Sequence, residues 1–280
     1  EGRGPVYLDT RHITPQQVRQ LKSAFLDMYP SQVLYWISNG INPQQEPVEV
    51  QTTEPYIVGG HCQAGYWVDI DRRTSLEGLY AAGDVAGGAP FKFVSGCWAE
   101  GVITARAAGK YADQVDRLEP EEGTIDQEQE RVFHPLHQHG KIFAGIRAVE
   151  VEARLQKVME EYAGGASRYY EMNEEQLLVA RRHLSRIPAN LDLLVAEDLH
   201  DLMKVHEILD RLDVAQVLVE HMLYRKETRW PSYHTRMDYP QRDDANWLKF
   251  VNSRRDPKTG AIEMLERPYE QLVPGDRYKP

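Results

Sequence analysis

The sequence predicts an α+β fold, with short strands and helices first, then a helical bundle, then a small irregular C-terminal region. Short β-like runs separated by glycines occupy residues 48–71, a pattern typical of strands and turns. A small apolar run then passes through Gly83-Asp84 and a glycine-containing loop into a helix rich in small residues. From residue 131 to residue 225 the apolar residues recur at helical spacing, which predicts packed helices.

Composition places the chain among soluble globular proteins. Its 280 residues are 41% hydrophobic and 27% charged, which is too apolar for a disordered chain. The formal net charge of −10 disfavours nucleic acid as a partner, because phosphate binding needs a basic face. No run of about 18 apolar residues occurs, so the sequence predicts no membrane span. Cys62 and Cys97 are the two cysteines, too few for a disulfide scaffold, an iron–sulfur cluster or a structural zinc cage.

The N-terminal segment carries clear helix signals. Residues 6–8 form a short apolar run that predicts a strand. Thr14 followed by Pro15 predicts a helix start, because threonine caps the first free N–H groups and proline suits the first helical position. Apolar residues at helical spacing continue this helix: Val18, Leu21, Phe25 and Met28. A second short helix is predicted over 31–38, ended by Asn39-Gly40.

The next segment alternates strands with turns and ends in a helix. Three short β-like runs are predicted as strands: 48–50, 56–58 and 66–68. Residues 79–82 are predicted as a small buried strand that leads into Gly83-Asp84. Gly96 is predicted to open a helix whose small residues allow close packing on a sheet. This order of strand, glycine loop and helix is typical of nucleotide-binding architecture.

The second half of the chain predicts a bundle of three or four helices. Residues 114–130 are acidic and poor in apolar residues, so they are predicted as a linker or solvated surface segment. Apolar stripes then predict helices over 146–163, over 177–187 and over 191–224. After residue 229 the chain is rich in Trp, Tyr and Arg, and Asp256–Gly260 is predicted as a hairpin turn.

The Gly83-Asp84 pair has a chemical rationale as part of a cofactor site. Glycine lets a ligand approach the backbone, and a carboxylate accepts hydrogen bonds from sugar-type hydroxyls. The start of the following helix offers free N–H groups and a positive dipole end. By itself such a pair is also an ordinary turn, so the residues alone leave both interpretations open.

Longer strings resemble a known family. Gly78–Val85, reading GLYAAGDV, resembles the second FAD-contacting motif of the succinate dehydrogenase/fumarate reductase flavoproteins, whose acidic residue holds the ribityl chain. Thr53–Gly60 resembles the strand-and-glycine element of that family. Its C-terminal signature resembles three further stretches: 225–229, 238–240 and 242–247. These matches occur in the family's order and cover nearly the whole chain.

Departures from the pattern point to a subgroup. Pro55 stands where the dicarboxylate-handling members have a histidine, and residues 91–96 lack their substrate-binding arginine. Without these two cations, succinate or fumarate is not the expected substrate. The remaining pattern resembles the flavoprotein (alpha) subunits of adenylylsulfate reductase, on four stretches: 53–61, 92–101, 227–231 and 253–260. Cys97-Trp98 departs from the Ser-His usual there.

The resemblance implies a cofactor, a domain plan and a site. The cofactor is FAD, with these contacts: Tyr56, Gly59, Gly60, Gly83, Asp84, Ser95 and Gly96. Residues 1–50 would be the C-terminal part of a capping domain, 51–113 the C-terminal part of the FAD-binding domain, and 128–280 the helical bundle and C-terminal domain. The family's Gly-rich pyrophosphate motif is missing from the sequence, so we expect the C-terminal half of a longer flavoprotein that by itself binds FAD weakly or not at all.

Two residues carry the expected chemistry. His61 corresponds to the subgroup's active-site histidine, and an imidazole there can bind a sulfate oxygen and move a proton at neutral pH; the alternative is a histidine that closes the Gly59-Gly60 turn. Lys92 is the nearest cation to the start of the helix at Gly96, and the alternative is a surface lysine.

The implied reaction is the reduction of adenylylsulfate to sulfite and AMP through a flavin adduct. Electrons would come from a separate iron–sulfur beta-type subunit, and the substrate would be this small anion or a similar one. One alternative is a fumarate reductase/succinate dehydrogenase-like flavoprotein for another substrate. The other is an inactive fragment that serves only as a folding or interaction module. The first residues, 1–5, carry no signal-peptide pattern, and we expect a cytoplasmic location.

Other conspicuous side chains have weaker interpretations. Three neighbouring histidines suggest a metal cluster: His134, His137 and His139. Pro135 lies between them and disfavours helical spacing, so we expect an irregular solvated segment without metal. Cys62 is either a reactive thiol beside His61 or simply small and buried. Four aromatic residues form either a subunit interface or core packing: Trp230, Tyr233, Tyr239 and Trp247.

Overall fold

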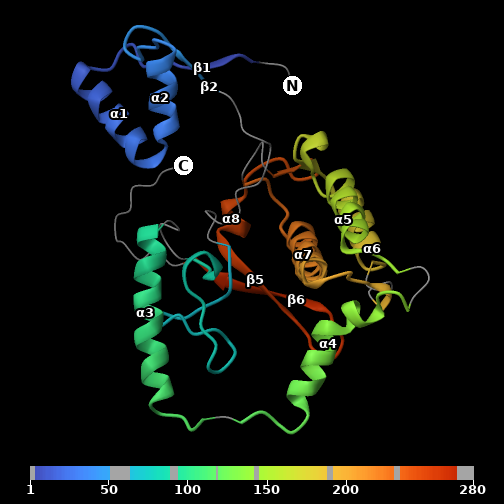
Figure 1. Ribbon diagram of the computed structural model, residues 1–280. Coiled ribbons are helices and arrows are strands. Elements are labelled where there is room, and N and C mark those ends of the chain that lie inside the picture. Colours follow the sequence, from blue (N-terminus) through green and yellow to red (C-terminus); the bar gives the residue numbers. More distant parts are fainter. Residues whose placement is uncertain are drawn as a thin grey trace. The chain divides into compact units, whose positions relative to one another are not determined.

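The computed structural model describes seven stretches of the chain: 4–50, 64–88, 94–117, 119–141, 145–187, 192–229 and 234–269. The chain divides into two compact units, Glu1–Tyr56 and Ile57–Pro280. Figure 1 shows the order of the elements along the chain. The predicted strand at 56–58 lies outside the described residues.

The first unit is a helical hairpin beside a two-stranded sheet. Strand β1 (Val6–Leu8) pairs antiparallel with β2 (Val48–Val50). Helices α1 (Pro15–Met28) and α2 (Pro30–Ser38) follow β1 in the chain. A small core holds them together, formed by Val33, Trp36 and Val48 with Leu21, Phe25 and Ile41 packed against it. The predicted strands and helices of this segment are confirmed.

The start of α1 shows why its prediction succeeded. The Thr14 hydroxyl accepts a hydrogen bond from the Gln17 N–H at 3.3 Å, and the Gln17 side chain accepts one from the Thr14 N–H at 2.8 Å. This reciprocal capping box satisfies two backbone donors that a helix start leaves free. Pro15 occupies the first turn, where no N–H partner is lost.

In the second unit, the segment 64–88 is a chain of turns rather than a set of strands. Tyr66 forms an isolated parallel bridge with Ala86, and Arg73 forms an antiparallel bridge with Tyr80. The predicted strands at 66–68 and 79–82 are therefore wrong. Each is directly preceded by a glycine with positive φ, Gly65 or Gly78, and each forms a single bridge rather than a ladder.

Helix α3 (Val94–Ala112) follows this segment and begins two residues before the predicted start. The 3₁₀ turn η2 (Gly83–Val85) packs against it. The predicted helix rich in small residues is confirmed, whereas the strand predicted before Gly83-Asp84 is absent from residues 64–88.

Four helices form the bundle: α4 (Thr124–Gln138), α5 (Ala148–Tyr162), α6 (Glu174–Leu184) and α7 (Leu199–Tyr224). The last three pack on one another around a shared apolar core that includes Val151, Leu177 and Val205 (Figure 1). The predicted bundle is confirmed.

Two boundaries of the bundle differ from the prediction. Helix α4 occupies part of the predicted linker and carries two of the three histidines, so the predicted irregular segment is wrong there. Pro135 lies inside α4 and removes one backbone hydrogen bond to the carbonyl four residues earlier, and the helix ends three residues later at Gln138. Helix α7 begins at Leu199 instead of 191, because the Asp198 side chain caps it by accepting from the Asp201 N–H at 2.9 Å.

The C-terminal region is built from short pairings. Strand β3 (Glu171–Met172) pairs parallel with β4 (Thr235–Arg236), and the short helix α8 (Asp244–Trp247) precedes the last hairpin. Strands β5 (Lys249–Arg255) and β6 (Ile262–Pro268) form that antiparallel hairpin. The Asp256 carboxylate accepts from the N–H groups of Lys258 and Thr259, both at 2.8 Å, which confirms the predicted turn. Among the described residues no helix is long and apolar enough to cross a membrane.

Candidate functional site

The turn at Gly83-Asp84 lies against the first turns of α3, as the predicted cofactor element requires. Gly83 has φ +69°, and a Cβ built on it would lie 3.1 Å from the Cys97 sulfur. Glycine is therefore required twice, for its backbone angle and for the close approach of the helix. The Cys97 thiol lies 3.8 Å from an Asp84 carboxylate oxygen, within hydrogen-bond reach for sulfur.

Asp84 and Ser95 are both exposed, and Gly96 is half-buried beside them in α3. An exposed carboxylate next to a helix N-terminus presents an acceptor and backbone donors to the same space. The structure thus brings four predicted contacts into one region: Gly83, Asp84, Ser95 and Gly96. The other predicted site residues lie outside the described residues: Tyr56, Gly59, Gly60, His61 and Lys92.

An ion pair between Arg72 and Glu100 fixes this region and was missed at the sequence level. Both side chains are largely buried, with exposures of 18% for Arg72 and 6% for Glu100. Two guanidinium nitrogens donate to the two carboxylate oxygens, one pair at 2.8 Å. A third nitrogen donates to the carbonyl of Ile70 at 2.8 Å. These hydrogen bonds raise the pKa of Arg72 and tie the segment before Gly83-Asp84 to the middle of α3.

A signal for Glu100 was present in the sequence. It is a single acidic residue in a helix otherwise composed of small and apolar residues around it, and such a residue needs a cationic partner when buried. The sequence gives no comparable signal for its partner Arg72. This residue lies in a turn and has a left-handed φ of +66°.

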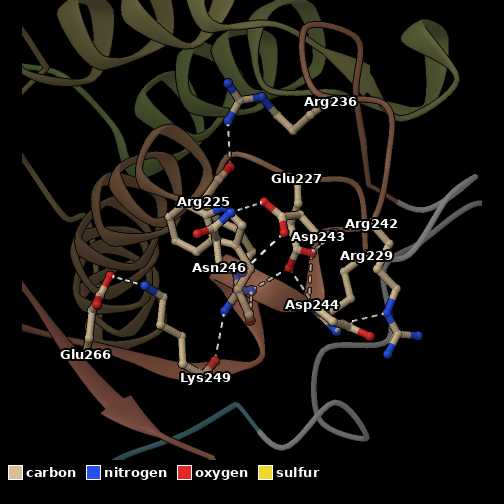
Figure 2. A network of polar contacts seen from close by, with 11 residues as sticks. Arg225, Glu227, Arg229, Arg236, Arg242, Asp243, Asp244, Asn246, Lys249 and Glu266 are labelled. Carbon is tan, nitrogen blue, oxygen red and sulfur yellow. Dashed lines mark hydrogen bonds and ion pairs between the residues drawn. The ribbon is translucent and has the colours of Figure 1, made fainter.

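A second cluster of charges is formed by the C-terminal signature. Figure 2 shows the Glu227 carboxylate among Arg225, Arg229 and Asp243. Glu227 is completely buried and accepts from Arg225 and Arg229, each at 2.6 Å, and from the Asp243 N–H at 3.0 Å. The buried Arg236 pairs with Asp238 at 2.8 Å.

This cluster closes the end of α7. Arg236 donates to the carbonyl of Met222, in the last turn of α7, and to the carbonyl of Arg225, the residue that follows the helix. Burial and the charges of Arg236 and Arg225 lower the pKa of His234 to about 4. The sequence identified these residues as a family signature, whereas the structure identifies them as a buried scaffold.

The aromatic residues of the tail pack against cations. Lys249 lies 4.7 Å from the centroid of the Trp247 ring and Arg225 lies 5.4 Å from it. Lys226 lies 5.6 Å from the Tyr239 ring. Both rings are half-buried within the chain. Trp230 and Tyr233 lie outside the described residues.

The histidines of α4 gather around one carboxylate. His134 and His137 lie 3.8 and 3.4 Å from the Glu130 carboxylate. Across the described stretches no group of three or more potential ligands is placed to hold a metal ion.

Comparison with known proteins identifies the class. Residues 152–277 match the family described as fumarate reductase flavoprotein C-term. The chain is also similar to the adenylylsulfate reductase alpha subunit of Megalodesulfovibrio gigas, at 28% identity over 99% of this chain, and to the fumarate reductase flavoprotein subunit of Haemophilus influenzae, at 27% over 92%. Residues 152–277 thus resemble the C-terminal region of the fumarate reductase flavoproteins, a class that implies a flavin cofactor.

Two classes of solved structure resemble the chain to different degrees. The structure of adenylylsulfate reductase from Archaeoglobus fulgidus matches with a TM-score of 0.79 at 33% identity over 97% of this chain. The E. coli quinol fumarate reductase matches with a TM-score of 0.63 at 22% identity, a likeness of fold alone. The chain thus resembles a C-terminal flavoprotein region of the adenylylsulfate reductase alpha type, and the α+β prediction is confirmed. It spans 48% of the M. gigas subunit and 49% of the A. fulgidus chain.

Proposed function

We propose that this chain is the C-terminal part of an FAD-dependent oxidoreductase that reduces adenylylsulfate to sulfite and AMP. The observation that carries the proposal is the match to an adenylylsulfate reductase structure over 97% of the chain at 33% identity. The sequence favours this substrate over fumarate, because Pro55 and the absence of an arginine from residues 91–96 remove two cations that would bind a dicarboxylate. The domain boundaries at 1–50, 51–113 and 128–280 remain part of the proposal.

The residues near α3 fit a flavin of this kind. The Asp84 carboxylate is exposed and suited to accept hydrogen bonds from cofactor hydroxyls. The N-terminal turn of α3, with Ser95 and Gly96, offers backbone donors and a positive dipole end to an electron-rich ring edge. When bound, FAD would supply the two-electron transfer.

The remaining proposed roles belong to binding and proton movement. His61 would hold an anionic oxygen of the substrate and transfer a proton at neutral pH. Lys92 would add a positive charge for the phosphosulfate group. An iron–sulfur beta-type subunit would deliver the electrons, because two cysteines in this sequence cannot hold a cluster. We propose a cytoplasmic location for the assembly.

The test measures turnover and flavin content on the native protein that contains this chain. Turnover of adenylylsulfate with loss of activity in His61→Ala supports the proposal, and turnover of fumarate alone overturns it. Absence of flavin absorption in the native protein overturns the enzyme interpretation and favours an interaction module.

The role of Asp84 is tested separately with a matched control. Asp84→Ala is expected to lower the flavin content, read from the visible spectrum, because it removes the acceptor for the cofactor hydroxyls. Asp113→Ala, an exposed aspartate just beyond the end of α3, is expected to leave the flavin content unchanged. Equal flavin content in the two variants would contradict the assigned contact.

A further inference from the structure

The ion pair of Arg72 and Glu100 connects the two parts of the proposed flavin element. One part is the turn at Gly83-Asp84, and the other is the first turn of α3, which contains Gly96. Glu100 lies one helical turn after Gly96 and on the same face of α3. Because a helix moves as a rigid rod over such a distance, a contact that fixes Glu100 also fixes the first turn of α3.

The backbone of Arg72 sets the path of the chain into the turn. Its carbonyl accepts a hydrogen bond from the Ala81 N–H at 3.1 Å, just before Gly83-Asp84. The next residue, Arg73, forms an antiparallel bridge with Tyr80. Residues 72–73 therefore lie beside residues 80–81 and hold the chain that enters Gly83-Asp84.

The side chain of Arg72 fixes α3 in distance and in rotation. Nε and Nη2 donate to the two carboxylate oxygens of Glu100, the Nη2 bond at 2.8 Å, and Nη1 donates to the Ile70 carbonyl at 2.8 Å. A planar guanidinium bonded at two points does not allow the rotation that a single-point contact allows. Both side chains are largely buried, so solvent does not loosen the pair.

The backbone angle of Arg72 indicates that the arginine side chain matters at this position. Its φ of +66° lies in the left-handed region, which is unfavourable for a residue with a Cβ. Glycine or asparagine adopts this angle more readily, so the turn by itself does not favour arginine. The contribution of arginine here is the reach of its side chain to Glu100. Backbone strain of this kind is concentrated near functional sites.

A second contact between the same two segments lies at the other end of α3. The Tyr111 hydroxyl donates to the Glu77 carboxylate at 3.1 Å. A helix rises about 1.5 Å per residue, so Tyr111 lies about 22 Å along α3 from Gly96. This contact therefore holds the end of α3 that is remote from the proposed flavin contacts.

We propose that Arg72 and Glu100 are positioning residues that hold Asp84 and the first turn of α3 in place against the flavin. Their role rests on the proposed function, since it concerns the cofactor that these two parts would contact. The positive end of α3 stabilises the more negative, reduced form of a flavin in preference to the oxidised form. Loosening the first turn of α3 therefore lowers the reduction potential of the bound flavin.

The experiment measures the midpoint potential of the flavin in the native protein that contains this chain, by spectroscopic redox titration. Glu100→Gln keeps the shape of the side chain and removes its charge. It is expected to reduce the preference for the reduced form by about tenfold, which lowers the potential of a two-electron couple by about 30 mV. Tyr111→Phe is the matched control and is expected to leave the potential unchanged, because it loosens only the remote end of α3.

The potential separates positioning from a loss of folded protein. A partly unfolded variant loses flavin, but the flavin that remains bound keeps the potential of the unchanged protein. If Glu100→Gln does not fold, Arg72→Lys replaces it and is expected to lower the potential in the same way, because lysine keeps the charge without the planar pair of donors. Potentials equal to that of Tyr111→Phe overturn the positioning role and leave the proposed function intact, whereas absence of flavin from the native protein overturns both.

Discussion

Replacing Glu227 by glutamine is expected to destabilise the C-terminal region strongly. Glu227 is completely buried and accepts four hydrogen bonds, two of them from Arg229 at 2.6 and 2.9 Å and one from Arg225 at 2.6 Å. The fourth comes from the Asp243 N–H at 3.0 Å. Glutamine fills the same volume, but it removes the charge and turns one acceptor into a donor that faces other donors.

The size of the effect follows from what each arginine retains. Breaking a buried ion pair from one side costs about 3–5 kcal/mol. Arg225 keeps the carbonyls of Trp247 and Lys249, at 3.0 and 3.2 Å, and Arg229 keeps Asp244 at 2.8 Å. Both arginines are also partly exposed, at 23% and 31%. We therefore expect the lower end of the range, about 3 kcal/mol.

The assay is urea unfolding followed by circular dichroism. With a slope of about 3 kcal/mol per molar, a loss of about 3 kcal/mol lowers the urea midpoint by about 1 M. Glu263→Gln is the matched control, since its pair with Arg254 is 53% and 68% exposed and exposed pairs contribute about 0–1 kcal/mol. A Glu227→Gln midpoint equal to that of Glu263→Gln would refute the reasoning.

Three further changes test other parts of the fold. His234→Gln is expected to flatten the acid side of the stability profile. The lowered pKa of about 4, against 6.5 unfolded, means that stability is complete above pH 6.5 and falls by up to about 3 kcal/mol as pH drops toward 4; urea midpoints at pH 7 and 4.5 that fall equally in both proteins would contradict this. Glu100→Gln is expected to speed hydrogen exchange across residues 66–87 by loosening their link to α3, whereas Asp113→Asn, at an exposed position just beyond the end of α3, leaves it unchanged; equal rates exclude the link. Leu177→Ala, at a fully buried position, is expected to cost about 2–5 kcal/mol, well above Leu178→Ala at 40% exposure; comparable urea midpoints would exclude that core assignment.

Local signals explain which elements could be predicted from the sequence. The capping box at Thr14 and the turn at Asp256 depend on residues two to three positions apart, so the sequence contains the whole interaction. Residues 66–68 have strand composition, but a strand exists only with a partner, and Gly65 and Gly78 reverse the chain too soon. The start of α7 was predicted eight residues early because apolar residues continue upstream, while Asp198 decides the boundary.

Long-range pairs explain what the sequence could not predict in the site. Gly83-Asp84 and the helix after it were found because motif and helix are close in sequence. Arg72 and Glu100 are separated by 28 positions, and nothing in either sequence neighbourhood specifies the other. The contact of Cys97 with Asp84 likewise depends on the angle at which α3 meets η2.

The ratio of acid to base distinguishes the charge clusters of this chain better than its net charge does. Arg72 is paired with the buried carboxylate of Glu100, and the buried Glu227 carboxylate is paired with two arginines, Arg225 and Arg229. Such clusters are satisfied internally and gain nothing from an added anion, so their removal affects stability. The same physical rule thus assigns the buried clusters around Glu100 and Glu227 to the scaffold.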